Sequence, residues 1–187
     1  MTAERDVNTQ PISRLGEWTD QPDGLGMRQT MGRWLTGVAV VTTVDQDGVA
    51  HGGTISSLQS ISLDPPILML APNFGTRTGE ALREQQRFGI SVLSGKQEAI
   101  ARRFAVRGGE RFEGGEFEDT PTGIPVIQGA LAQTECALHK HDVIGDHDVY
   151  YGLVTASRSR TGTPLAFLGG RFGDFRDFGH EELPWSF

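Results

Sequence analysis

The sequence has a single cysteine among its 187 residues, Cys136. An intramolecular disulfide is therefore excluded, and such scarcity is typical of proteins from a reducing compartment. Cys136 lies in an alternating strand pattern, so we expect a buried structural thiol rather than a nucleophile. The N-terminus lacks the apolar core of a signal peptide, and no stretch is long and apolar enough to span a bilayer. We expect a cytoplasmic protein.

Positive charge is also in short supply. Seventeen lysines and arginines face 24 aspartates and glutamates, which gives a net charge of −7. A broad surface for nucleic acid or anionic membrane is therefore excluded, and an anionic ligand needs a local basic site. The sequence also lacks a G-x-S-x-G elbow, a G-x-x-x-x-G-K-[ST] phosphate loop and a G-x-G-x-x-G between strand and helix. These absences exclude several enzyme classes with those fingerprints.

Glycine is plentiful, with 25 residues, and nine prolines accompany it. Many turns follow from this composition, and the chain length suits one domain, so we expect a β-rich fold. Residues 1–24 are polar and aperiodic and predict a loose arm, in which Trp18 is the possible anchor. Residues 25–175 form the domain. Residues 176–187 are an aromatic tail that we expect to pack on the body or on a second subunit.

The first elements follow from local patterns. Met27, Met31, Trp34 and Leu35 recur with helical spacing and predict one apolar helix face, with Gly37 as its stop. Residues 38–44 are β-branched and predict a buried strand. Residues 45–48, with sequence DQDG, predict a hairpin turn with positive φ at Gly48.

The stretch 51–70, with sequence HGGTISSLQSISLDPPILML, is the chemical centre of the sequence. Side chains alternate faces along a strand, which places hydroxyls on one side and apolar groups on the other. The predicted hydroxyl side is Thr54, Ser56, Ser60 and Ser62, and the predicted core side is Ile55, Ile61 and Leu63. Ser57 and Leu58 break the alternation and indicate a kink. Glycines just upstream let a flat ligand approach the backbone closely, although a plain half-buried strand fits the same residues.

After a strand at residues 67–71, Thr76 or Thr78 caps a predicted helix that begins near Arg77. Free N–H groups, a hydroxyl and an arginine at a helix start suit a phosphate, and they also suit an ordinary cap. Phe88, Ile90 and Val92 predict another strand. Residues 94–97 have capping-box spacing and open a helix with Phe104 on its inner face.

The second half begins with a glycine-rich acidic loop at residues 106–125. Two long strands at 130–141 and 147–156 and a last strand at 164–172 follow. His139, His141 and His147 allow a metal-binding alternative, because two of them share a strand face and the third lies across the turn. Such spacing is weak evidence, so we expect no metal site.

Four blocks resemble the flavin reductase family of two-component monooxygenases: MRQTMGRWLTGVAVVTT, GGTISSLQSISLDPP, GIPVIQGALAQTEC and GDHDVYYGLV. The resemblance runs from about Met27 to about Phe172. It implies a β-rich α+β fold of the FMN-binding split-barrel type with a few flanking helices, usually as a homodimer. Leu58 departs from the family, in which many members have phenylalanine there, and the arm and the tail lie outside the match.

The resemblance also implies a function: an NAD(P)H:flavin oxidoreductase that supplies reduced flavin to a separate monooxygenase. FMN or FAD and NADH or NADPH would be bound, with no metal. By the match, the flavin-binding residues are Thr54, Ile55, Ser56, Ser57, Ala71, Thr76, Arg77 and Phe104. The nicotinamide-binding residues are His147, Gly170, Arg171 and Phe172.

The residues agree with this chemistry, because hydride transfer needs two stacked rings and excluded water rather than a nucleophile or a strong acid or base. We expect His147 to position the nicotinamide by hydrogen bonding or stacking. Two alternatives remain open. One is a flavin carrier or redox sensor on the same fold without reductase activity, and the other is the metal-binding protein that uses the three histidines.

Overall fold

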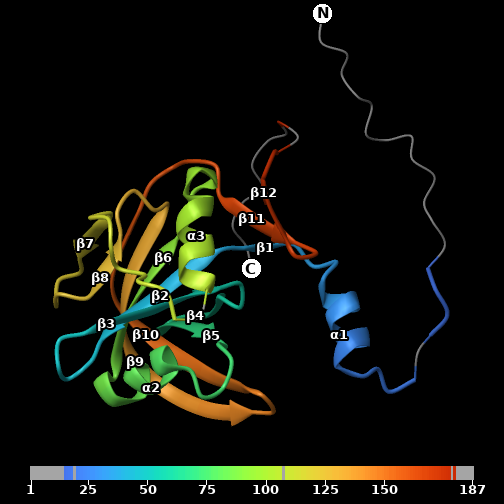
Figure 1. The fold of residues 1–187 in the computed structure, drawn as a ribbon, viewed down its shortest axis with the longest axis horizontal. Coiled ribbons are helices and arrows are strands. Elements are labelled where there is room, and N and C mark those ends of the chain that lie inside the picture. Colours follow the sequence, from blue (N-terminus) through green and yellow to red (C-terminus); the bar gives the residue numbers. More distant parts are fainter. Residues whose placement is uncertain (1–14, 19, 107, 178, 180–187) are drawn as a thin grey trace, which may run out of the picture.

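The computed structural model describes residues 15–18, 20–106, 108–177 and 179. Most of the predicted arm, and the tail residues Phe178, Trp185 and Phe187, lie outside this part of the chain. The described chain is a β-rich α+β structure with three α-helices and a large antiparallel sheet (Figure 1). None of its helices is long and apolar enough to cross a membrane.

The large sheet has seven strands in the order β3-β2-β6-β9-β10-β5-β4. Their bounds are β2 Ala39–Val44, β3 Ala50–Ile55, β4 Gln59–Leu63, β5 Pro66–Leu70, β6 Arg87–Val92, β9 Ala132–Ile144 and β10 His147–Ser159. The two edge strands, β3 and β4, are consecutive in the chain and are joined by residues 56–58 alone. Because so short a link spans about 14 Å at most, the sheet curves until its two edges converge at this corner.

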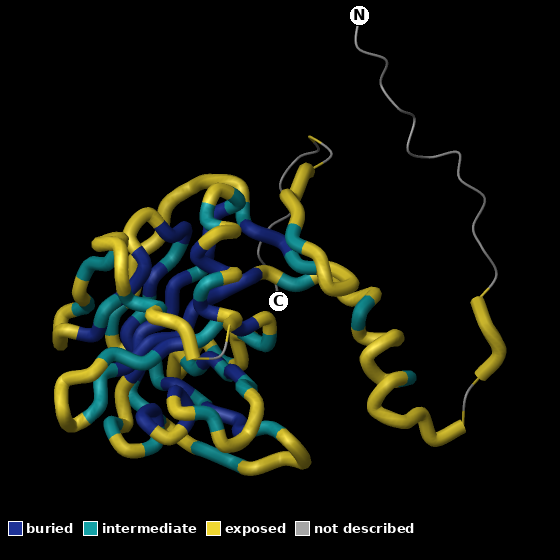
Figure 2. The backbone as a smooth tube through the Cα atoms, viewed as in Figure 1, coloured by how far each residue is buried: buried dark blue, intermediate teal, exposed yellow. Residues whose placement is uncertain are grey.

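Two helices cover the sheet, and two apolar clusters form the core. The helices are α2 Arg77–Gln85 and α3 Glu98–Ala105, the latter opened by the 3₁₀ helix η1 Gly95–Gln97. Strand β2 is buried on both faces because Val41 packs into one cluster, with Leu82 and Phe88, and Val40 into the other, with Phe104. Figure 2 shows the buried segments concentrated in these strands. Cys136 is fully buried in the first cluster, which confirms the expected structural thiol.

Several local predictions are confirmed. Gly48 has a φ of 79° in the turn between β2 and β3. Ser94 and Gln97 form the expected capping box at η1. The turn between the two long strands is shorter than predicted, because β9 continues to Ile144 and leaves two residues, Gly145 and Asp146, before β10.

The predicted last strand at residues 164–172 is wrong as a single element. It is a hairpin of β11 Leu165–Leu168 and β12 Arg171–Asp174, in which β11 also pairs with β1 Thr36–Gly37. Gly169 and Gly170 have φ of 57° and 81°, a left-handed backbone that favours glycine and turns the chain. The predicted loop 106–125 likewise contains β7 Phe117–Asp119, which pairs with β8 Pro125–Ile127.

The first helix also differs from its prediction. Helix α1 Gly24–Met31 begins after the cap residue Asp23 and ends at Gly32, so Trp34 and Leu35 lie beyond it and Gly37 is not its stop. None of its residues is buried, and it stands away from the body (Figures 1 and 2). The spacing of apolar residues predicted a buried face, but the described chain provides no surface to cover it.

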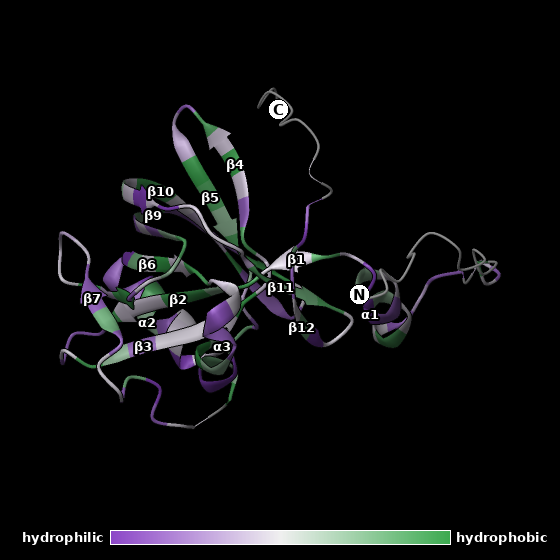
Figure 3. Cartoon of the chain, turned by 90° about the horizontal axis from the view of Figure 1, so that it is seen from above, coloured by the Kyte–Doolittle hydropathy of each residue, from purple (hydrophilic) through white to green (hydrophobic). Residues whose placement is uncertain are grey.

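The central stretch 54–63 is two strands rather than one kinked strand. The expected break falls at residues 56–58, and Ile55 is buried as predicted. Ile61 and Leu63, however, are 51% and 80% exposed, so their predicted core side is wrong. They lie on β4, which with β5 projects from the rest of the molecule (Figure 3), and no described element packs over them.

Candidate functional site

The start of α2 has the geometry of a phosphate-binding helix terminus. Thr76 is the cap residue, and its hydroxyl accepts a hydrogen bond from the Gly79 N–H at 3.1 Å. Arg77 follows at the first helical position and is exposed. None of the ion pairs in the described chain involves Arg77, so its guanidinium faces solvent beside the positive end of the helix. The sequence reasoning predicted this arrangement.

The turn between β9 and β10 lies directly against the segment that leads into α2. Asn73 and His147 form an isolated antiparallel bridge. The Phe74 N–H donates to the Asp146 carbonyl at 2.9 Å, and the Asp148 N–H donates to the Pro72 carbonyl at 3.0 Å. The fold therefore brings His147 next to Thr76 and Arg77, about 70 residues away in sequence.

Ser57, in the segment that links β3 to β4, contacts the same region. The Ser57 hydroxyl accepts a hydrogen bond from the Ala71 N–H at 2.9 Å. Chain connectivity and these hydrogen bonds thus link five of the predicted residues: Ser57, Ala71, Thr76, Arg77 and His147. We call this region, residues 71–77 with Ser57 and the turn residues 146–148, the α2 corner.

His147 is half-buried and its Nδ1 lies 2.7 Å from the carboxylate of the neighbouring Asp146. This hydrogen bond lowers the pKa of Asp146, and Arg28 on α1 adds a smaller effect of the same sign. The Asp146 carboxylate is almost wholly exposed, so the pair is screened by solvent. The hydrogen bond between Asp146 and His147 Nδ1 orients the imidazole and leaves Nε2 for a ligand.

Other predicted residues already have partners inside the protein. The Thr54 hydroxyl donates to the Ala101 carbonyl of α3 at 2.7 Å. Ile55 packs into the first core cluster. Phe104 is 1% exposed and contacts the rings of Phe112 and Phe117. Ile55 and Phe104 are thus buried and the Thr54 hydroxyl is engaged, so a ligand at this strand would meet its backbone, while the neighbouring Ser56 is exposed.

The structure does not bring the terminal residues to His147. Gly170, Arg171 and Phe172 lie on the β11–β12 hairpin, which is separate from the β9–β10 turn and above it in Figure 1. Phe172 packs against Phe167, with ring centroids 5.4 Å apart, and the Arg102 guanidinium lies over the Phe172 ring, 5.1 Å from its centroid. Arg171 is exposed.

The three histidines of the metal-binding alternative do not converge. His139 falls at a register shift between β9 and β10 and is exposed. His141 bonds instead to Asp148, with 2.7 Å between Nε2 and Oδ1. Among the described residues no group of three or more histidine, cysteine, aspartate or glutamate side chains is arranged to hold a metal ion.

Sequence reasoning missed a buried polar network behind the α2 corner. At its centre is Asp148, whose side chain is fully buried and bonds to Arg83 of α2. Tyr150, on the same face of β10, donates to the Gly79 carbonyl at 2.9 Å. An aspartate two positions before a tyrosine, on the same face of a strand, was the signal that could have revealed it.

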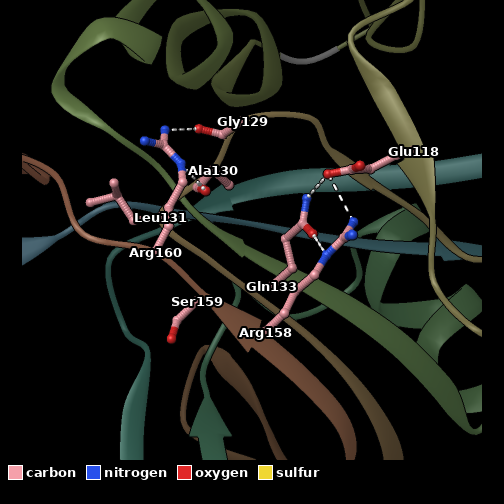
Figure 4. Close-up of a pocket in the computed structure, with 8 residues that line it drawn as sticks. All are labelled: Glu118, Gly129, Ala130, Leu131, Gln133, Arg158, Ser159 and Arg160. Atoms are coloured by element: carbon pink, nitrogen blue, oxygen red, sulfur yellow. Dashed lines mark hydrogen bonds and ion pairs between the residues drawn. The ribbon is translucent and has the colours of Figure 1, made fainter.

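Two cavities among the described residues lie away from the α2 corner. They have volumes of about 200 and 360 Å³ and share Gln133 and Arg158, at the other end of the β9–β10 hairpin. Figure 4 shows that the polar side chains of the smaller one bond to one another: Arg158 and Gln133 both meet Glu118.

Comparison with known proteins identifies the family. The flavin reductase like domain matches residues 31–176. FMN reductase (NADH) SmoA of Agrobacterium fabrum is 38% identical over 148 residues, which cover 79% of this chain and 84% of that protein. The reductase subunit HsaB of a flavin-dependent monooxygenase from Rhodococcus jostii is 32% identical over 159 residues, which cover 84% and 81%.

A solved structure agrees with these relatives. Streptomyces globisporus NADH:FAD oxidoreductase SgcE6, in complex with NAD and FAD fragments, superposes with a TM-score of 0.82 at 31% identity. The match covers 88% of this chain and 100% of that one. The present chain belongs to the flavin reductase family.

Proposed function

We propose that this protein is an NAD(P)H-dependent flavin reductase that passes hydride from nicotinamide C4 to flavin N5 and supplies reduced flavin to a separate monooxygenase. The observation that carries the proposal is the bridge between Asn73 and His147. It sets the candidate nicotinamide-binding histidine beside the helix start suited to a flavin phosphate. The family match and the reductase names of the relatives support the same activity.

The residues of the α2 corner fit a phosphate group. The Thr76 hydroxyl, the N–H groups at the start of α2 and the solvent-facing guanidinium of Arg77 offer hydrogen bonds and positive charge at one place. The flavin accepts hydride at N5 when bound, so the protein need not provide an acid or a base. Residues 54–57 hold the ring edge through backbone groups, because Thr54 and Ser57 already use their hydroxyls within the protein.

The second nucleotide is held by His147. Its imidazole, oriented by Asp146, hydrogen-bonds or stacks on the nicotinamide nucleotide so that the reacting atoms lie about 3–3.5 Å apart. Gly170, Arg171 and Phe172 do not reach His147 within one chain, so in this proposal they complete the nucleotide pocket only in a larger assembly. Phe104 contributes indirectly. It packs against Gly52 and thereby supports β3, the strand that the flavin approaches.

The proposal includes a split-barrel architecture, a homodimer and a cytoplasmic location. The three-residue link between the sheet edges supports the barrel. Exposed apolar residues on α1 and β4 support the dimer. The lone cysteine supports the reducing compartment. We keep the division into an arm at 1–24, a domain at 25–175 and a tail at 176–187.

Initial rates with NADH or NADPH and FMN or FAD, in all four combinations, test this function. We expect NADH or NADPH oxidation that depends on both protein and flavin, and the preferred pair identifies the cofactors. A carrier or redox sensor would bind flavin, leave NADH and NADPH unoxidised, and behave identically after His147→Ala. The absence of turnover in every combination would refute the reductase.

A further inference from the structure

Asp148 is a fully buried carboxylate one residue from His147. Its Oδ1 accepts a hydrogen bond from Arg83 Nη1 at 3.0 Å and lies 2.7 Å from His141 Nε2. Its Oδ2 has no hydrogen-bond partner in the described part of the chain. A buried carboxylate needs such partners, because isolated charge is strongly disfavoured away from water.

A glycine in the first turn of α2, Gly79, lets the Asp148 carboxylate approach the helix. A Cβ at Gly79 would lie 2.9 Å from the Tyr150 hydroxyl and 3.4 Å from Asp148 Oδ2. Only glycine therefore allows both polar groups to reach the first turn of α2, although glycine weakens a helix. Burial, followed by the negative charge of Asp148, raises the pKa of Tyr150 to about 12, so its hydroxyl stays a donor to the Gly79 carbonyl.

The backbone of Asp148 is tied to the same corner. Its N–H donates to the Pro72 carbonyl, and the bridge between Asn73 and His147 follows immediately. Neighbouring side chains in a strand point to opposite faces, so Asp148 points inward to α2 while His147 points outward. A shift of Asp148 relative to Arg83 would move His147 relative to Thr76.

We propose that Asp148 is a positioning residue for the flavin reductase reaction: through Arg83 and His141 it holds the β9–β10 turn in register with α2, so that His147 and the Thr76–Arg77 helix start face one nicotinamide and one flavin nucleotide together. This inference rests on the proposed function. A buried ion pair is often no more stabilising than apolar residues of the same shape, so its value lies in fixing geometry.

The charge balance supports this role. Arg83 lies on α2 and neutralises the carboxylate where the helix start would attract an anion. An unpaired aspartate there would repel a phosphate. The ion pair of Arg83 and Asp148 therefore fixes α2 relative to the β9–β10 turn without leaving an unpaired negative charge beside the proposed phosphate site.

The matched control is Glu135, a second buried, ion-paired carboxylate on the same hairpin. Its Oε1 lies 3.3 Å from Arg87 Nη1, and it is nine residues along β9 from Ile144, roughly 30 Å from the turn. Asp148→Asn and Glu135→Gln each remove one buried charge and preserve shape. Both should lower the melting temperature, but only one lies behind the α2 corner.

The experiment measures kcat, KM for the nicotinamide and flavin affinity for both variants and the unaltered protein. For Asp148→Asn we expect KM for the nicotinamide and the flavin Kd to rise at least about fivefold, within the hundredfold that a misplacement of about 1 Å costs. For Glu135→Gln we expect both within about twofold of the unaltered protein. Unchanged KM and Kd in Asp148→Asn, or equal rises in both variants, would overturn the proposal.

A second variant keeps the test decisive if Asp148→Asn does not fold. His141→Phe preserves the ring packing on Tyr150, whose centroid lies 4.8 Å from that of His141, and removes one donor to Asp148. We expect a smaller rise in nicotinamide KM, and an unchanged KM would overturn the role. If the unaltered protein oxidised neither NADH nor NADPH, the proposed function itself would fail, which is a different result from turnover that ignores these substitutions.

Discussion

At the scale of single residues, two hydroxyls of the 54–57 stretch form hydrogen bonds that stabilise the fold. Thr54 ties β3 to α3 through the Ala101 carbonyl, and Ser57 holds the end of β5 through the Ala71 N–H. Because these groups are engaged, the phosphate recognition that we propose at the α2 corner depends on Arg77, which is exposed. Arg77 is thus the residue whose loss should change affinity with least effect on the fold.

Replacing Arg77 with alanine should weaken flavin binding by about 1.5–3 kcal/mol, the scale of a charge-assisted hydrogen bond. Flavin fluorescence quenching measures the change in Kd. Arg158→Ala is the control, because Arg158 is also an exposed arginine but lies at the other end of the β9–β10 hairpin. Equal affinities for Arg77→Ala and the unaltered protein would place the phosphate elsewhere.

Cys136 gives a second residue-scale expectation. Burial raises the pKa of its thiol from the usual 9.0 to about 11. The folded state disfavours the thiolate, so stability from this group is fully present below about pH 9 and is lost as the pH rises through about 11. At pH 8 a thiol reagent should therefore leave the native protein unmodified and react with one thiol after denaturation. Fast native labelling would contradict a buried structural thiol.

At the scale of elements, local patterns predicted well wherever the deciding contacts are close in sequence. The turn at residues 45–48, the Thr76 cap and the capping box at residues 94–97 each depend on bonds across two to four residues. The α2 corner was predicted in part, since Thr76 and Arg77 were visible in the sequence and the family match supplied His147.

The remaining elements could not be predicted because their environment depends on distant chain. Alternation placed Ile61 and Leu63 in a core, but β4 is the edge strand and no described segment covers that face. Helical spacing extended the first helix to Leu35, whereas Gly32 ends it. The Asp148 network joins residues 65 positions apart, and no local pattern links Arg83 to it.

Strand β3 offers a test at this scale, because its two adjacent glycines have different surroundings. A Cβ at Gly52 would lie 2.8 Å from Phe104 Cε1 and 2.9 Å from the Val41 carbonyl, whereas a Cβ at Gly53 meets nothing within 4 Å. Gly52→Ala should lower the free energy of unfolding by about 1–3 kcal/mol through overpacking. Gly53→Ala should change it by no more than about 0.5 kcal/mol. Urea unfolding of both variants measures this, and equal values would mean that Phe104 moves freely.

At the scale of the whole molecule, the exposed apolar surface is concentrated away from the compact body. Helix α1 contributes Leu25, Met27 and Met31, each about half exposed or more, and Trp34 follows at 69%. Figure 3 shows α1 and the β4–β5 hairpin projecting from the rest of the molecule. Exposed apolar residues gathered on such elements are typical of an interface, and a second copy of the chain is the partner that our proposed homodimer assigns to them.

Sedimentation velocity at micromolar concentration should therefore give a dimer. The double substitution Met27→Glu and Met31→Glu places two charges one helical turn apart on the proposed interface, where burial would leave them unpaired, so dissociation to monomers is expected. Val49→Glu is the matched control: Val49 is 53% exposed but lies at the β2–β3 turn, outside α1 and β4, so this variant should remain dimeric. If the dimer requires α1, loss of the nicotinamide site should accompany dissociation, since Arg171 and Phe172 do not reach His147 within one chain. A monomeric unaltered protein with full activity would instead place the whole site in a single subunit.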